Sequence, residues 1–128
     1  MKYEERIKGM VDRIRLENDS DESDEVLENK IYACIENLSN NFGIGHMAGL
    51  PDKTQIALVH IVYDIGIDEF SKMEKMWEYL DIWHDKGNEA AEELMKSPYA
   101  LKFPERAKKN AELIREGGES DYHEENLF

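Results

Sequence analysis

Carboxylates form the densest group of residues that could do chemistry in this chain. Five of them stand within seven positions: Asp19, Asp21, Glu22, Asp24 and Glu25. Carboxylates this close can chelate calcium, but a calcium-binding loop needs a central glycine for its turn and a distant bidentate glutamate. Asp24 occupies the glycine position here. We therefore interpret the run as a solvated acidic cap of the next helix, with Ser20 or Ser23 as capping residue, and predict no metal site.

The histidines and the cysteine form no pattern that binds a metal or a cofactor. The histidines are not at metal-ligand spacings, and His60 lies in an apolar segment where a hydrogen-bonded core histidine is expected. Cys34 is the only cysteine, which excludes an internal disulfide and a cysteine-rich zinc site and favours a buried, inert thiol. We predict no cofactor.

Two further clusters have a simple structural interpretation. The rings of Trp77, Tyr79 and Trp83 could form a sugar-stacking groove, but aromatic residues at helical spacing are usually core. A small basic cluster consists of Arg106, Lys108 and Lys109. It is more simply explained as a set of partners for nearby acids than as a phosphate or cell-wall contact.

Net charge limits the choice of partner. Sixteen basic residues stand against 29 acidic ones, a formal charge of -13. Such a surface repels nucleic acid and anionic cell wall, since like-charge fields slow encounter and cost affinity. Solubility alone can explain the acidity. The sharper hypothesis is that the chain docks on a basic protein surface, including one that otherwise holds nucleic acid.

Length and composition indicate one globular domain. The 128 residues, 41% of them hydrophobic, suit a single core. No stretch approaches the roughly 20 apolar residues of a membrane span. The first six residues contain no signal-peptide core. We therefore expect a cytoplasmic protein with no membrane partner.

Helical periodicity dominates, so the fold class expected is all-α. Apolar stripes predict helices at about 2–17 and 23–39, and residues 40–51 with their three glycines are interpreted as a loop. Nearly every position from Ile56 to Ile65 is apolar, which predicts a buried central helix over residues 53–66 with Gly66 as its stop. Further helices are predicted at about 70–80, 88–96 and 104–116. About six helices would thus form one domain, residues 1–117, followed by an acidic, flexible tail, residues 118–128, that Leu127 and Phe128 could anchor.

The motifs of the second half occur in an informative order. They are Tyr63-Asp64-Ile65-Gly66, then Phe70 to Trp77, then Ala90-Ala91-Glu92-Glu93-Leu94-Met95-Lys96-Ser97, then Pro104-Glu105-Arg106-Ala107. This order and spacing resemble the C-terminal helical lobe of the phage-type lysozymes, glycoside hydrolase family 24. Ser23-Asp24-Glu25 through Leu38, followed by Leu50-Pro51, extends the resemblance backwards, so residues 23–117 match in order. The resemblance implies a lysozyme-like helical domain.

The catalytic half of the family pattern is not recognisable. Family enzymes have a first helix that ends in the catalytic glutamate, within a Glu-Gly-x-Arg-Leu element, and then a β-hairpin. Arg15-Leu16 fits this element, but Asp12 or Arg13 stands where the glutamate should be. Only about five residues separate Leu16 from the next helix, which leaves no room for the hairpin that carries the second wall of the cleft. Glu17 could stand in as the acid, although a solvated helix-end glutamate is the simpler interpretation.

A rival alignment places the catalytic glutamate later in the chain. Asp24-Glu25-Val26-Leu27, Lys30-Ile31-Tyr32 and Gly43-Ile44-Gly45-His46 resemble the family sequence around its catalytic glutamate and hairpin strand. Glu25 would then be the general acid, Cys34 would replace the usual aspartate and Asn41 would lie near the usual threonine. This alignment requires strands where the spacing from Leu27 to Leu38 predicts an uninterrupted helix.

Together these patterns favour binding over catalysis. We expect a non-catalytic, lysozyme-like pseudoenzyme, encoded by a phage or prophage, that engages and inhibits a host protein with a basic surface, such as a nucleic-acid-binding defence factor. The residues expected at this surface are Asp19, Asp21, Glu22, Asp24, Glu25, Glu119, Asp121, Glu124 and Glu125. One alternative is a minimal peptidoglycan muramidase that uses Glu25 or Glu17. Another is a structural or oligomeric phage protein that makes contacts through the region from Trp77 to Trp83.

Overall fold

The computed structural model describes residues 3–82, 86–117 and 127–128, and within them the chain forms helices and no strand. The all-α prediction is confirmed. The elements are α1 (Tyr3–Asn18), α2 (Asp24–Phe42), α3 (Ile44–Ala48), α4 (Asp52–Ser71), α5 (Glu74–Ile82), α6 (Gly87–Met95), α7 (Pro98–Lys102) and α8 (Pro104–Gly117). These eight helices correct the predicted number of about six. Among the described residues, none of them has the length and apolar character needed to cross a membrane.

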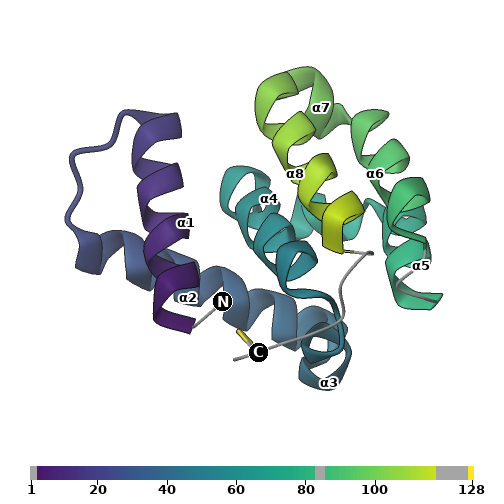
Figure 1. Ribbon diagram of the computed structural model, residues 1–128, viewed down its shortest axis with the longest axis horizontal. Helices are drawn as coiled ribbons and strands as arrows, with labels where there is room; N and C mark the ends of the chain where they lie inside the picture. Colours follow the sequence, from purple (N-terminus) through teal and green to yellow (C-terminus); the bar gives the residue numbers. More distant parts are fainter. Residues whose placement is uncertain (1–2, 83–85, 118–126) are drawn as a thin grey trace.

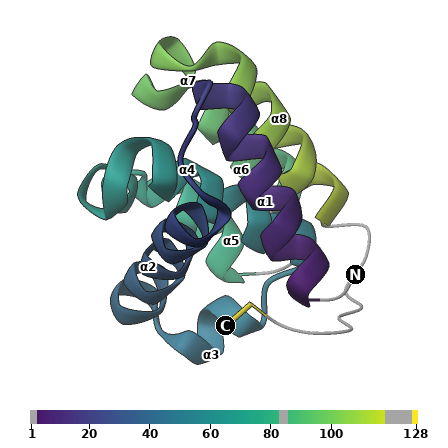
Figure 2. The same cartoon turned by 90° about the vertical axis from the view of Figure 1, so that its left-hand side faces the viewer.

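Helix α4 is the centre of the molecule. The six residues from Ala57 to Val62 are all buried, as the apolar run predicted. Helices α1 and α2 pack on one side of α4, while α8 packs on the other side and is covered by α6 and α7 (Figure 1). A view turned by 90° shows α1 and α2 on the near side of the molecule, running in diverging directions (Figure 2). The predicted central helix is therefore confirmed as an element surrounded on most of its faces.

Gly66 breaks α4, as predicted, but the chain resumes a helical path up to Ser71. The glycine has φ 83° and ψ 161°, a conformation that is essentially restricted to glycine. The chain is therefore kinked at this point, and Phe70 in the segment after the kink is again buried in the core. A pocket lined by Asp64 and Ile65 lies next to this kink.

The two short helices, α3 and α7, were not predicted, because their segments contain or adjoin glycine and proline, which usually indicate a loop or a bend. Helix α3 falls inside residues 40–51, which were interpreted as loop and also hold the last turn of α2. The buried Gln55 side-chain nitrogen caps the end of α3, since it donates to the carbonyl oxygen of Met47 at 3.0 Å. It also donates to the carbonyl oxygen of Leu50, just after the helix, at 2.9 Å. Helix α7 begins at Pro98, which suits the first turn of a helix because its missing N–H would have no partner there.

Small residues bring α6 and α8 into close contact. Ala90 and Ala91 of α6 and Ala107 and Ala111 of α8 are all buried. At Gly87, where α6 begins, a β-carbon would lie only 2.8 Å from the carbonyl oxygen of Ile114, so no larger residue fits without movement. This tight pair holds α8 in place for the functional site.

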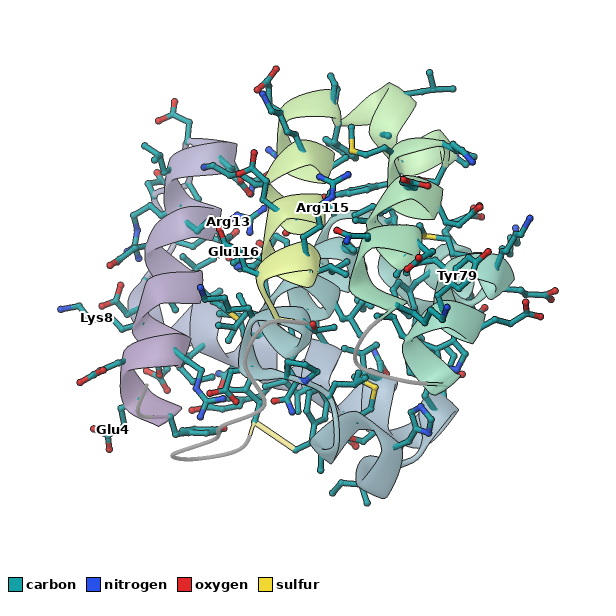
Figure 3. All side chains as sticks on the ribbon, turned by 45° about the vertical axis from the view of Figure 1, so that its right-hand side comes forward. Glu4, Lys8, Arg13, Tyr79, Arg115 and Glu116 are labelled. Atoms are coloured by element: carbon teal, nitrogen blue, oxygen red, sulfur yellow. The ribbon has the colours of Figure 1, made fainter. Side chains whose placement is uncertain are left out.

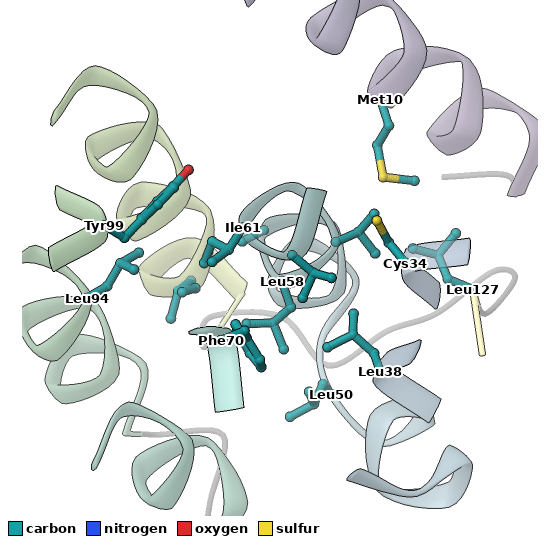
Figure 4. Packing of buried hydrophobic residues seen from close by; sticks show 14 of the residues in the cluster. Met10, Cys34, Leu38, Leu50, Leu58, Ile61, Phe70, Leu94, Tyr99 and Leu127 are labelled. Atoms are coloured by element: carbon teal, nitrogen blue, oxygen red, sulfur yellow. The ribbon is translucent and has the colours of Figure 1, made fainter. Parts of the chain in front are cut away.

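The far end of the chain joins the same core. Leu127 is buried and Phe128 packs against the cluster, which agrees with the expected anchoring of the terminus. Figure 4 shows Leu127 among the buried side chains on the side of α1 and α2, with Leu94 and Tyr99 on the opposite side of α4. On the same side, the buried Arg6 guanidinium of α1 lies 3.2 Å from the Asp52 carboxylate at the start of α4.

Candidate functional site

A cluster of polar side chains joins α1, α4, α7 and α8, and we call it the Asp64 cluster: Glu17, Asp64, Tyr99, Arg106 and Asn110. Asp64 accepts a hydrogen bond from the Tyr99 hydroxyl at 2.6 Å and another from Arg106 Nη1 at 2.9 Å. The Tyr99 hydroxyl accepts in turn from the Asn110 amide at 3.0 Å. The Arg106 Nη2 group donates to the backbone carbonyl of Glu17 at 2.7 Å. One guanidinium therefore connects the end of α1 to the end of the buried segment of α4.

Local structure places each of these groups. Asp64 is two residues before the Gly66 kink, where the buried helix reaches the edge of the core. Pro104 starts α8 and sets Arg106 in its first turn, while Asn110 follows one turn later on the buried face. Arg106 also lies against the Phe103 ring, with its guanidinium carbon 4.8 Å from the ring centre. The Pro-x-Arg-Ala motif thus supplies the link between α1 and α4.

Burial controls the electrostatics of this cluster. The Asp64 side chain is 4% exposed. Burial raises the pKa of this carboxyl, and the Tyr99 and Arg106 hydrogen bonds act in the opposite direction. Burial and the neighbouring Asp64 also raise the pKa of Tyr99, so its hydroxyl remains a donor at neutral pH. Both Asp64 oxygens have a fixed donor, which is typical of a structural network rather than a reactive carboxylate.

His60 lies one helical turn before Asp64, and it is buried as predicted, with 2% exposure. Burial lowers its pKa well below the usual value, helped by the nearby cations Arg13, Lys109 and Arg106. The ring is therefore neutral at pH 7. Its nitrogens make no hydrogen bond within the described part of the chain, which departs from the predicted hydrogen-bonded histidine.

Glu17, which the sequence offered as a stand-in for the catalytic acid, lies near the end of α1. Its side chain is only 11% exposed, so the interpretation as a solvated helix-end residue is wrong. Its carboxylate lies 3.0 Å from Arg13, 3.8 Å from Arg106 and 3.9 Å from Lys109. A general acid needs a transferable proton and a second group across an open cleft. Glu17 is instead an ion-pair acceptor inside a cluster of cations.

Glu25, the other candidate acid, is exposed in the first turn of α2. The rival alignment that makes it catalytic needs strands within the segment that follows. That segment is helical, since α2 runs to Phe42 and α3 starts at Ile44. The structure contradicts the strands that this alignment requires.

The acidic run is partly neutralised by its neighbours. Arg15 pairs with Asp24 at 2.6 Å, and Lys30 pairs with Glu22 at 2.8 Å. Ser23 is the helix cap, as one of the two predicted candidates, because its hydroxyl accepts from the backbone N–H of Val26. The residues left exposed with no ion-pair partner in the described part of the chain are Asp19, Asp21 and Glu25. The remaining predicted contact residues, Glu119, Asp121, Glu124 and Glu125, lie outside the described residues.

The other sequence candidates are structural where they can be described. Cys34 is buried, and burial raises the pKa of its thiol to about 11, so the thiol stays protonated and inert at neutral pH. Trp77 packs on Phe42, with ring centres 4.1 Å apart, which agrees with a core role. Trp83, His84 and His123 lie outside the described residues. Within the described ranges, no group of three or more His, Cys, Asp or Glu side chains could hold a metal ion.

Two concave regions flank the Asp64 cluster. One is a groove between α1 and α8 that contains Leu16, an apolar side chain left 79% exposed. Figure 3 shows Arg13 of α1 and Glu116 of α8 near this groove. The other is a pocket of about 400 Å³ between the end of α4 and α7, with Asp64 and Tyr99 in its wall.

Comparison of the chain with protein-family models, with curated proteins and with solved structures finds no match. The Asp64 cluster itself was missed from the sequence, although a signal was present. His60 and Asp64 are the two polar residues between Ile56 and Ile65, four residues apart and therefore on one face of the helix. A polar pair inside an apolar helix predicts partners from other elements, because buried polar groups need them.

Proposed function

We propose that this protein is a non-catalytic binding protein, encoded by a phage or prophage, that uses an acidic surface to engage a host protein with a basic surface. The observation that carries the proposal is that many basic side chains are already paired with carboxylates of the same chain. Nine basic side chains of the described residues lie within 4 Å of a carboxylate: Arg6, Arg13, Arg15, Lys30, Lys53, Lys72, Lys96, Arg106 and Lys109. The excess of negative charge is therefore left on other acids, among them Asp19, Asp21 and Glu25.

The surface we propose is the segment from Asp19 to Glu25. The Arg15–Asp24 and Lys30–Glu22 pairs and the Ser23 cap hold its backbone against α1 and α2. Its unpaired carboxylates are thus presented from an ordered segment, which reduces the entropy lost on binding. Carboxylates fixed in this way can occupy a basic groove and displace its counterions much as phosphates do. A host factor that binds nucleic acid is the class of partner that offers such a groove.

Two features support binding rather than hydrolysis. The candidate acid Glu17 is held by three cations, and the other carboxylate beside it, Asp64, shares Arg106 with it. No strand is present in residues 3–82, where the hairpin of a phage-type lysozyme would lie. The resemblance to the helical lobe of these enzymes therefore supports a retained scaffold with a different use.

Affinity capture from a bacterial lysate tests the proposal. The tagged protein should retain a basic protein, and the affinity should fall by at least about tenfold between about 50 and 200 mM salt, as expected when several charges pair across an interface. Duplex DNA should compete with the captured complex. A captured partner whose affinity does not change with salt would contradict binding by charge mimicry.

The muramidase alternative is tested in parallel, since Glu17 borders the groove that contains Leu16. Purified protein should not clear a suspension of bacterial cell walls. Clearing that is lost in Glu17→Gln, or in Glu25→Gln, would overturn the non-catalytic proposal and identify the acid.

A further inference from the structure

We propose that the pocket between α4 and α7 binds a small amphipathic anion, namely a carboxylate carried on a compact apolar chain. The pocket has a volume of about 400 Å³ and is lined by Asp64, Ile65, Glu69, Lys72, Met73, Pro98, Tyr99 and Lys102. We call it the α4–α7 pocket. This volume lies within the range of roughly 300–1,000 Å³ that is typical of small-molecule sites.

The kink at Gly66 shapes the pocket. Ile65 lies just before the kink, Met73 follows the end of α4, and both side chains line the pocket. Pro98 and the Tyr99 ring complete the apolar wall from α7. An apolar chain of a ligand would replace water on these four side chains, which is the usual source of affinity in such a pocket.

The polar part of the wall is rigid before any ligand arrives. Asp64 is held by Tyr99 at 2.6 Å and by Arg106 at 2.9 Å, and Asn110 holds the Tyr99 hydroxyl from behind. Tyr99 is itself buried. A wall fixed by hydrogen bonds keeps its shape, so little conformational entropy is lost on binding.

The charged side chains of the pocket wall indicate that its ligand is an anion. Arg106 balances Asp64, and Lys72 pairs with Glu69 at 2.9 Å. Lys102 has no carboxylate partner within the described residues, and its ammonium lies 5.4 Å from the centre of the Phe103 ring. Of the two lysines in the pocket wall, Lys102 is thus the one whose charge is left for a ligand, in a protein with a formal charge of -13. An anion can pair with Lys102 and draw Lys72 from its exposed and weak pair with Glu69.

This inference does not depend on the acidic docking surface, which lies on α2 and the segment before it. The two proposals can therefore fail separately. A protein that binds no basic partner can still bind the anion, and the converse also holds.

Three ligands with the same apolar chain test the pocket: octanoate, octanol and octylamine, each added below its micelle concentration in a two-dimensional amide NMR titration. Octanoate should cause saturable shifts centred on Ile65, Met73 and Tyr99, octanol should bind more weakly, and octylamine should leave these signals unchanged. Equal binding of octanoate and octanol, any matching effect of octylamine, or no saturable shift would overturn the proposal.

Two variants and a control locate the site. Lys102→Gln should weaken octanoate binding by about fivefold or more, as expected for loss of a charge-assisted contact. Met73→Trp should fill the pocket and abolish binding while thermal unfolding remains cooperative. Lys108→Gln removes a lysine of α8 that does not line the pocket and should bind octanoate as the parent does. An equal loss in Lys102→Gln and Lys108→Gln would contradict a defined site.

Discussion

At the scale of single residues, Asp64 is the acceptor that connects distant parts of the chain. Tyr99 and Arg106 lie 35 and 42 residues away in sequence, yet each donates to one of its oxygens. A carboxylate that is nearly buried and fully hydrogen-bonded stabilises the fold only while all of its partners are present. Its removal leaves the Tyr99 hydroxyl and the Nη1 group of Arg106 without the acceptor that each has in the fold.

Asp64→Ala should therefore destabilise the protein by about 2–4 kcal/mol, a range reduced because Arg106 keeps some access to water. The free energy of unfolding in urea measures this change. Asp68→Ala, on an exposed position of the same helix, is the matched control and should change stability by no more than about 0.5 kcal/mol. Equal effects at the two positions would show that Asp64 is not part of a structural network.

His60 gives the stability a defined pH dependence. Its pKa in the folded protein lies well below the ordinary value of 6.5, so the unfolded chain binds a proton that the folded chain does not. This contribution to stability is complete above pH 6.5 and is lost as the pH falls below it, at up to about 1.4 kcal/mol per pH unit. Urea unfolding between pH 7.5 and 5 should show a steeper loss for the parent than for His60→Leu, because carboxylate titration is common to both. Parallel curves would contradict a neutral, buried ring.

The sequence predicted that His60 is buried and Cys34 inert, because both stand in apolar stripes. It did not predict that Glu17 is enclosed. A charged residue near the end of a helix is normally expected to be exposed to water. Glu17 is covered because α8, much later in the chain, places Arg106 and Lys109 next to its carboxylate. Contacts across 89 residues leave no local signal.

At the scale of elements, two glycines have opposite roles. Gly66 adopts a backbone conformation that other residues avoid, and it separates the two segments of α4. Gly9 lies in the exposed middle of α1, with ordinary helical backbone and open space around it. The same substitution should therefore change stability in opposite directions.

Gly66→Ala should destabilise the fold by about 1–3 kcal/mol, because a β-carbon strains the backbone there. Gly9→Ala should stabilise it by about 0.5–1 kcal/mol, because alanine loses less conformational entropy in a helix. Urea unfolding of the two variants beside the parent gives both signs. A neutral or stabilising Gly66→Ala would contradict the kink.

Hydrophobic periodicity predicted α1, α2, α6 and α8 within a few residues of their ends, since each buries an apolar stripe. It misplaced the boundary between α4 and α5, because α4 resumes after Gly66 and includes Phe70, with which the next predicted helix began. It failed at α3 and α7, which have five residues each and are too short to display a period. Their stability comes from tertiary contacts instead, such as the Gln55 amide that caps α3. The α4–α7 pocket was also beyond prediction, because it depends on where α7 returns to the kinked helix.

At the scale of the whole molecule, the function that we propose depends on the acidic surface. Internal ion pairs use many of the cations, and the remaining acids give the protein a field that attracts basic surfaces and repels nucleic acid. If the attraction is only general, the affinity for a basic partner depends on the net charge of the protein. If the interface is specific, the affinity also depends on which acidic residues are present.

Two double variants with the same net charge separate these possibilities. Asp21→Lys with Glu25→Lys reverses two exposed acids of the proposed surface, and Glu74→Lys with Glu78→Lys reverses two exposed acids of α5. Glu25 and Glu74 both stand in the first turn of a helix, so the loss of dipole stabilisation is matched as well.

The most direct test of the account is the affinity of these two double variants and the parent for the basic protein captured from a bacterial lysate, measured at several salt concentrations. The account predicts that the Asp21 and Glu25 reversals weaken binding by at least about tenfold at low salt, while the Glu74 and Glu78 reversals have a much smaller effect. An equal loss in both variants, or an affinity that does not change with salt, would contradict it.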